Sequence, residues 1–198
     1  MVIFTHRLVI DLVYKQCDWS TMNLRPEITE KSQEIYKGKY ISLRRDEVTV
    51  SNGRKTIREV VGHPGAVAIV PITKNRKVIL VRQYRYAAQK VLLEVPAGTL
   101  EIAEDPKLAA IRELREETGF SAKNLRYLTG FWTAPGFCSE FIHGYLATEL
   151  IEDPLSPDED EFIETEEVDI DNVAELIRCG EIQDSKSISC LLTTILIL

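Results

Sequence analysis

The stretch GTLEIAEDPKLAAIRELREETGF, residues 98–120, has helix-end signals on both sides of one short predicted helix. Among its acidic residues, four glutamates stand at fixed spacing: Glu104, Glu113, Glu116 and Glu117. Asp105 is a good N-cap residue, and Pro106 suits the first turn because its missing N–H needs no partner there. Gly119 is a natural residue just past a helix end. The sequence therefore predicts a helix from about Pro106 to Thr118.

Three glutamates lie on one side of this predicted helix. At about 100° per residue, Glu113, Glu116 and Glu117 fall at roughly 0°, 300° and 40°. Converging carboxylates repel one another unless a cation offsets the repulsion, and hard oxygen ligands suit Mg²⁺ or Mn²⁺. The cluster therefore indicates a cation site, the alternative being a solvated acidic helix face. The apolar face is expected to consist of Leu108, Ile111 and Leu114.

Composition limits the classes of partner. The chain has 198 residues and 44% hydrophobic content, enough for one well-packed core with a small appendage. A net charge of −7 and a pI of about 5.1 provide no overall field that attracts nucleic acid or an acidic membrane. We therefore expect neither nucleic-acid nor membrane binding, and an anionic substrate must be drawn by local cations and metal.

The cysteines and the start of the chain carry no targeting or zinc signal. No CxxC pair and no zinc spacing is present, which indicates idle thiols in a reducing cytoplasm. Charged residues interrupt the apolar start, so neither a signal peptide nor a membrane span is predicted. An ordinary domain start begins at Met22, and residues 1–21 are expected to be an upstream extension that is not native or is disordered. The cysteines are Cys17, Cys138, Cys179 and Cys190.

Short strands and turns are expected on both sides of the helix. A strand from Glu34 to Val50, a turn at residues 51–53 and a strand from Arg54 to Val61 make residues 22–61 a β-rich N-terminal unit. Residues 62–198 form the main domain, and the class is α/β (α+β) with a mixed sheet and flanking helices. Further strands are expected at 65–72, 78–86, 91–95, 125–133 and 141–150, followed by an acidic loop, a helix at about 172–178 and an apolar helix after Asp184.

The spacing of the first motif resembles a Nudix box. It consists of Gly98, five residues, Glu104, seven residues, Arg112-Glu113, Leu114, one residue, Glu116-Glu117, one residue, Gly119 and Phe120. Seven specified residues at an average usage of about 7% each should arise by chance well under about once in a million such chains. The resemblance implies the Nudix fold, a mixed β-sheet sandwiched between α-helices.

Further blocks narrow the resemblance. HPGAVAIVPI, VRQYRYA, LLEVPAG, TAPGFCSE and DEDEFIE are similar to successive blocks of ADP-ribose pyrophosphatases of the Nudix superfamily, over residues 36–195. Pro135, sixteen residues after Gly119, resembles the proline that marks the ADP-sugar branch. The resemblance implies an enzyme that hydrolyses ADP-ribose, or a related ADP-sugar, to AMP and ribose 5-phosphate.

The resemblance also assigns the metal site. It implies two or three Mg²⁺ ions, with Mn²⁺ as a substitute, held by the backbone carbonyl of Ala97, by the three glutamates of the helix and by Glu161. Such ions neutralise the phosphates and lower the pKa of a bound water. Arg112 is expected to pair with a carboxylate and Glu104 to hold the loop, both supporting the ligands.

A general base is expected from the acidic block at residues 158–164. Glu161, just before an apolar pair, best matches the catalytic glutamate of the relatives, and Glu159 is the second choice. Closure of such a loop over the substrate would complete the site only when it is occupied. By composition alone, the alternative is a solvated acidic loop.

Five further residues are implied in substrate binding. Arg85 resembles an arginine that binds the diphosphate, for which a planar charged fork is suited; the alternative is a surface arginine at a strand end. Arg58 and Glu59 are expected to reach the nucleotide, and Glu140 to accept hydrogen bonds from ribose. Tyr40 matches a position where relatives place an aromatic ring against adenine, the alternative being a core or strand-pairing aromatic.

The N-terminal unit is expected to form a homodimer. In the relatives, these strands lie across a partner subunit and complete the adenosine pocket between chains. The β-rich unit from Lys31 to Val61 is too small to hold a core of its own, which fits that role.

Two other functions remain open from the sequence. A hydrolase of another nucleoside diphosphate sugar, such as GDP-mannose, would keep the metal ligands and change only the base pocket. A sensor that binds ADP-ribose without cleaving it is the second, although its usual marks, degraded box glutamates or an added DNA-binding domain, are not seen in this sequence.

Overall fold

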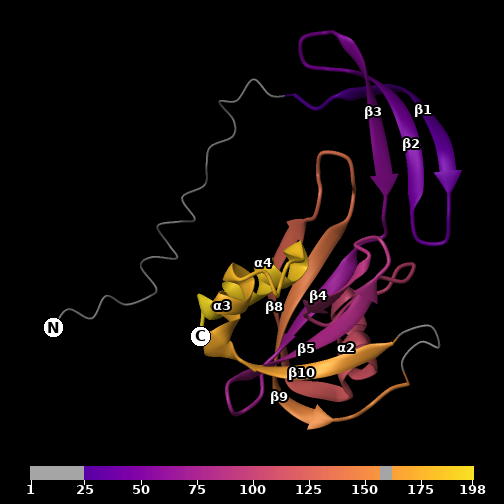
Figure 1. The fold of residues 1–198 in the computed structure, drawn as a ribbon. Helices are drawn as coiled ribbons and strands as arrows, with labels where there is room; N and C mark the ends of the chain where they lie inside the picture. Colours follow the sequence, from indigo (N-terminus) through magenta and orange to yellow (C-terminus); the bar gives the residue numbers. More distant parts are fainter. Residues whose placement is uncertain (1–24, 157–161) are drawn as a thin grey trace.

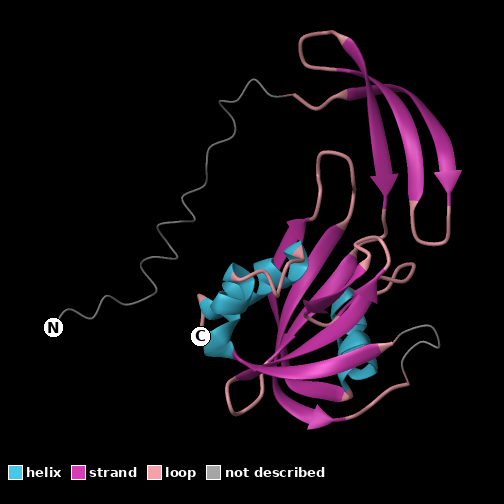
Figure 2. Ribbon diagram, viewed as in Figure 1, coloured by secondary structure: helices cyan, strands magenta, loops and turns pink. Residues whose placement is uncertain are grey.

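The structure is a computed structural model, and it describes residues 25–156 and 162–198 (Figures 1 and 2). Three sheets have the strand orders β1-β2-β3, β10-β5-β6 and β7-β4-β9-β8. In chain order the elements are β1 (Ile28–Lys37), β2 (Ser42–Thr49), β3 (Lys55–Gly62), β4 (Ala66–Pro71), β5 (Lys77–Arg85), β6 (Lys90–Glu94), β7 (Ala97–Thr99), α2 (Pro106–Thr118), β8 (Phe120–Trp132), β9 (Phe141–Glu152), β10 (Ile163–Asp169), η2 (Ile170–Asn172), α3 (Val173–Arg178) and α4 (Ser185–Ile195).

The core is built on both faces of β4, which is buried along its whole length. Val67 and Ile69 face α2, whereas the alternate residues of the strand face the cluster that includes α3 and α4. β4 pairs parallel with β9, while β7 and β8 add antiparallel edges, so the sheet is mixed. Figure 2 shows helices on either side of these strands. The predicted fold class is confirmed.

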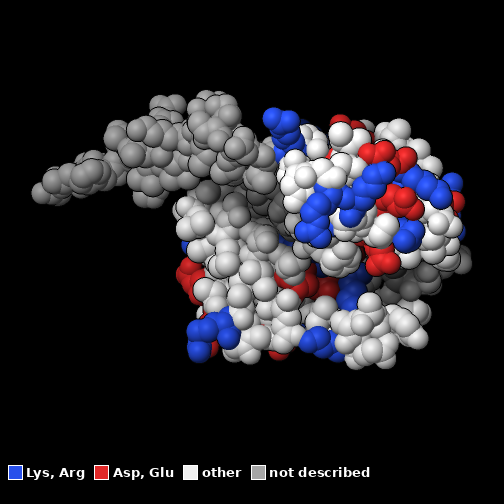
Figure 3. Space-filling model, turned by 90° about the horizontal axis from the view of Figure 1, so that it is seen from above, with Lys and Arg blue, Asp and Glu red and all other residues white. Residues whose placement is uncertain are grey.

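The N-terminal strands β1, β2 and β3 form an antiparallel sheet at one end of the molecule (Figure 1). The single strand predicted from Glu34 to Val50 is wrong, because Gly38 donates its N–H to the carbonyl of Ile41 at 2.8 Å and the chain turns there. The turn predicted at 51–53 is present, with Gly53 at a φ of 80°. Seen from above, acidic and basic side chains lie interspersed over this sheet (Figure 3).

The sheet of β10, β5 and β6 contains a strand that the sequence pattern did not predict. Residues 163–169, expected in an acidic loop, form β10 and pair antiparallel with β5. Cations of β5 offset the glutamates of this strand: Arg82 Nε lies 2.7 Å from Glu166, and Lys77 Nζ lies 3.3 Å from Glu167. Cross-strand charge pairs thus allow an acidic segment to form a strand.

The other predicted elements lie within a few residues of their observed positions, apart from two differences. β8 begins at Phe120 rather than at 125, and the short strand β7 was not expected. Among the described residues, no helix combines the length and apolar character needed to cross a membrane.

Candidate active site

Helix α2 has the bounds that its sequence predicts. Asp105 Oδ1 accepts hydrogen bonds from the N–H groups of Lys107 at 2.9 Å and Leu108 at 3.2 Å. Gly119 ends the helix with a φ of 76°, a left-handed conformation that suits glycine, and donates to the carbonyl of Arg115 at 3.1 Å. Caps of this kind depend only on neighbouring residues, so they could be recognised from sequence.

The predicted apolar face of α2 is confirmed only for Leu114, which is 1% exposed. Leu108 is 62% exposed and Ile111 is only partly buried, whereas Glu113 and Glu117 are buried. The small side chains of Ala109 and Ala110 let this side of the helix approach β4, which turns the glutamates inward with them. The buried residues of the helix are Ala109, Ala110, Glu113, Leu114 and Glu117.

The loop before the helix covers the two buried glutamates. The N–H of Ala97 donates to Glu117 Oε2 at 3.0 Å. A Cβ added to Gly98 would lie 1.9 Å from the carboxyl carbon of Glu113, so only glycine allows the main chain to pass this close. β7 is thus fixed against the carboxylates that α2 presents.

Arg112 offsets part of the negative charge. Its Nε and Nη2 each lie 3.1 Å from an oxygen of Glu104, and its Nη1 contacts Glu113 at 2.7 Å and Glu116 at 2.9 Å. The hydrogen bond from Arg112 lowers the pKa of Glu104 below its ordinary value. Glu104 also accepts from the N–H of Glu101 at 2.9 Å, which ties the loop to the helix.

The donor set suits a hard divalent cation. Glu113 and Glu117 are carboxylates more than nine-tenths buried, and the main chain at Ala97 lies beside them. Buried carboxylates are costly unless cations compensate them. The described residues contain no ready-made group of three acidic, histidine or cysteine side chains for a metal, and Arg112 contacts two of the glutamates instead.

Arg85, at the end of β5, is anchored by Glu94 at the end of β6. Arg85 Nη2 lies 2.7 Å from Glu94 Oε2, and Nε lies 3.1 and 3.2 Å from the two carboxylate oxygens. Burial alone would raise the pKa of Glu94, but the hydrogen bond from Arg85 and the charge of Lys186 bring it below its ordinary value. Arg85 also lines a cavity of about 310 Å³ together with Ala97 and Gly98.

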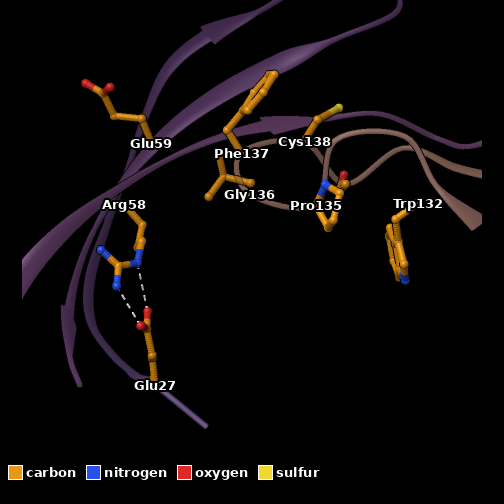
Figure 4. Close-up of a pocket in the computed structure, with 10 residues that line it drawn as sticks. Glu27, Arg58, Glu59, Trp132, Pro135, Gly136, Phe137 and Cys138 are labelled. Atoms are coloured by element: carbon orange, nitrogen blue, oxygen red, sulfur yellow. Dashed lines mark hydrogen bonds and ion pairs between the residues drawn. The ribbon is translucent and has the colours of Figure 1, made fainter. Parts of the chain in front are cut away.

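A second cavity lies between β3 and the loop after β8 (Figure 4). Val61 donates its N–H to the carbonyl of Phe137 at 2.8 Å and accepts from the N–H of Ser139 at 2.9 Å, so the two segments are joined through their main chains. Arg58 Nη2 pairs with Glu27 at 2.7 Å. The lining consists of Glu27, Arg58, Glu59, Val60, Trp132, Pro135, Gly136, Phe137, Cys138 and Ser139.

Tyr40 lies apart from Arg58 and Glu59. It is 57% exposed in the turn between β1 and β2, so it is neither a core nor a strand-pairing residue. It lines a different cavity, together with Gly98, Glu113 and neighbouring residues of the box. Within one chain, the structure therefore does not bring the three proposed nucleotide contacts into one pocket.

The remaining predicted residues divide into two groups. Glu140 lines the cavity of Arg85, and its Oε1 lies 3.7 Å from Nδ1 of His63. Glu159 and Glu161, the expected bases, lie outside the described residues.

Several residues of these cavities were missed from the sequence. Trp132 and Phe137 line the second cavity. Their positions next to Pro135-Gly136 in the sequence could have indicated that they share the pocket of Pro135. The pairing of Glu94 with Lys186 could not be recognised from the sequence, because 92 positions separate the two residues.

Comparison with known proteins decides the family. A model described as the NUDIX domain matches residues 62–188, well over half of the chain. The chain belongs to the Nudix family. A model described as the nucleoside diphosphate sugar hydrolase N-terminal domain matches residues 27–61 of this Nudix protein, which correspond closely to β1, β2 and β3.

Individual relatives cover most of this Nudix protein. An ADP-ribose pyrophosphatase of Bacillus subtilis is 42% identical over 163 residues, covering 81% of the chain and 88% of the relative. A methanol dehydrogenase activator of Bacillus methanolicus is also 42% identical, covering 82% and 89%. A GDP-mannose pyrophosphatase of Salmonella typhimurium is 30% identical, covering 81% and 91%. A crystal structure described as an ADP compounds hydrolase has a TM-score of 0.78 at 25% identity, covering 86% and 93%.

Proposed function

We propose that this Nudix protein hydrolyses ADP-ribose, or a closely related ADP-sugar, to AMP and ribose 5-phosphate. The observation that carries the proposal is the pair of buried glutamates on α2 that lies directly against the main chain of β7. The higher identity to the ADP-ribose pyrophosphatase than to the GDP-mannose pyrophosphatase supports the choice of substrate.

Mg²⁺ is the proposed cofactor, and Mn²⁺ is an alternative ion. Glu113, Glu116, Glu117 and the carbonyl of Ala97 would hold it. When bound, such cations supply charge neutralisation and an activated water. The role of Arg112 is to balance the carboxylates and that of Glu104 is to hold Arg112 in place, as their direct contacts support.

The remaining residues act on the substrate. Arg85 binds the diphosphate through a fixed, permanently charged guanidinium. Arg58, Glu59 and Pro135 contribute to the nucleotide pocket at the cavity between β3 and the loop after β8, which they line together. Glu140 contacts ribose from the cavity of Arg85.

The proposed base is Glu161, with Glu159 as the second choice. This assignment rests on the resemblance of the block at residues 158–164. The cytoplasmic location also stays a prediction.

The substrate assignment is tested with a panel of nucleotide sugars and Mg²⁺. We expect ADP-ribose to release AMP fastest, with ribose 5-phosphate as the second product detected by chromatography. GMP release from GDP-mannose at a higher rate would favour the other hydrolase. Binding of ADP-ribose without AMP release would favour the sensor.

We further propose that the N-terminal sheet forms a homodimer. All ten residues of β1 are exposed, and large apolar side chains of this sheet, Ile28, Ile35, Tyr36 and Ile57, are uncovered in one chain. A three-stranded sheet of this size is stabilised by packing against a second surface. In a dimer, Tyr40 of one chain would contribute to the nucleotide pocket of the other. Within a single chain, Tyr40 and Arg58 line different cavities.

Light scattering tests the dimer. The expected mass is twice the 22.5 kDa of one chain, because association would bury the exposed apolar side chains of the sheet. A fully active monomer of 22.5 kDa would contradict the proposal.

A further inference from the structure

Four charged side chains join the ends of β5 and β6 to the first turn of α4. Glu94 is 1% exposed and pairs with both Arg85 and Lys186: Arg85 Nη2 lies 2.7 Å and Lys186 Nζ 2.5 Å from the same oxygen, Oε2. Lys186 Nζ also lies 2.9 Å from Asp184 Oδ1. Asp184 in turn caps α4 by accepting from the N–H of Ser187 at 3.0 Å. The cluster therefore contains two carboxylates and two cations in one connected chain of contacts.

This cluster is continuous with the site of the proposed chemistry. Ser187 Oγ accepts from the N–H of Val95 at 2.8 Å, and two residues further along the chain Ala97 donates to Glu117. Arg85 and Lys186 line the same cavity as Ala97 and Gly98. A displacement at the start of α4 would thus be transmitted to both the arginine and the loop over the glutamates.

The guanidinium of Arg85 is hydrogen-bonded to Glu94 along one of its edges only. Nε and Nη2 bind Glu94, while Nη1 has no hydrogen bond among the described residues. The side chain of Arg85 is 38% exposed. A guanidinium fixed along one edge presents its other edge in a defined direction, which suits a phosphate oxygen.

Glu94 needs both cations to keep this arrangement. A buried carboxylate with a single partner recruits whatever donors are within reach, because an uncompensated buried charge is costly. Without Lys186, the remaining donors of Arg85 are the nearest source of compensation. Lys186 therefore leaves Arg85 available to the cavity.

We propose that Lys186 is a positioning residue: by sharing the charge of Glu94 it holds Arg85 in the orientation that binds the substrate's diphosphate. This inference rests on the proposed function only through the assignment of Arg85 to the diphosphate. It adds α4, an element outside the box, to the parts of the fold that determine substrate affinity.

The test is a double-mutant cycle read by calorimetric binding of inorganic diphosphate with Mg²⁺ present. We expect Lys186→Met to weaken binding about fivefold to tenfold, as does Arg85→Gln, because both remove the same oriented charge-assisted contact. The double variant is expected to bind no more weakly than Arg85→Gln alone. In AMP-release assays, Lys186→Met is expected to raise KM while kcat changes less than about twofold. This is the pattern for losing a contact that stabilises the bound substrate and the transition state equally.

Lys90→Met is the matched control. Lys90 is an exposed lysine at the start of β6 that bonds to Gln183, so its removal changes the net charge near the cavity without touching Glu94. Its diphosphate affinity is expected to stay that of the wild type. Thermal unfolding checks each variant. If Lys186→Met does not fold, Glu94→Gln combined with Lys186→Met removes both charges and is expected to show the same weakening.

Three results would overturn the inference. The first is unchanged diphosphate affinity in Lys186→Met, and the second is a loss of affinity in the double variant equal to the product of the two single losses. The third is a loss of affinity in Lys90→Met as large as that in Lys186→Met. Absence of diphosphate binding to the wild type would overturn it as well, by removing the role of Arg85. None of these depends on AMP release, so a failure of the proposed hydrolysis is recognised separately in the substrate panel.

Discussion

The Glu117→Gln variant is expected to lose turnover by about a thousandfold while its fold is retained. Glutamine has nearly the same shape, and its amide oxygen still accepts the hydrogen bond from the Ala97 N–H that now reaches Glu117 Oε2 at 3.0 Å. It lacks the negative charge of the carboxylate, and a neutral amide oxygen binds a hard divalent cation more weakly. The measurement is AMP release from ADP-ribose at saturating Mg²⁺, together with the Tm.

The matched control for this variant is Glu175→Gln. Glu175 is an exposed glutamate of α3 that pairs with Arg178, so its substitution removes the same charge away from the glutamates of α2. Its turnover is expected to equal that of the wild type. Near-normal turnover of Glu117→Gln at saturating Mg²⁺ would count decisively against the assigned site.

Gly98→Ala is expected to reduce turnover by about a hundredfold, since a displacement of about 1 Å in a reacting group has an effect of that size. The new methyl group would lie 1.9 Å from the carboxyl carbon of Glu113, and one of the two must move. Glu113 is buried and is held by Arg112 at 2.7 Å, so the shift falls on the proposed metal ligands. Calorimetric Mn²⁺ binding should weaken in parallel with turnover.

Gly53→Asn serves as the control for the glycine substitution. Gly53 lies in the turn between β2 and β3 with a φ of 80°, which asparagine tolerates, and an added Cβ would meet nothing within 4 Å. Wild-type turnover is expected. If Gly98→Ala also retained full turnover and full Mn²⁺ affinity, close contact between β7 and Glu113 would not matter for the site.

The box helix could be predicted from sequence because its signals are local. Asp105 and Gly119 act on residues within one turn, and the helix observed agrees with the one predicted from about Pro106 to Thr118. Which side of the helix is buried depends instead on β4 and β7, elements that lie outside the helix. Leu108 therefore faces solvent, and Glu113 lies inside.

The rest of the site could not be predicted because it is made by long-range contacts. β10 is stabilised by cations of β5 that are more than eighty positions away, as in the Arg82–Glu166 pair with a separation of 84. The partner of Arg85 was not anticipated, although Arg85 itself was selected from its motif. The resemblance to known Nudix hydrolases could identify single candidate residues. It could not predict that Tyr40 and Arg58 would line two different cavities.

The main-chain link between Val61 and the loop at Phe137 and Ser139 has a consequence for how such enzymes diversify. Hydrogen bonds between peptide groups do not depend on which side chains the residues carry. The side chains that line this cavity, the proposed nucleotide pocket, can therefore be substituted while the scaffold and α2 stay unchanged. A design that aims at a new nucleobase should start with Arg58, Glu59 and Trp132 and leave α2 unchanged.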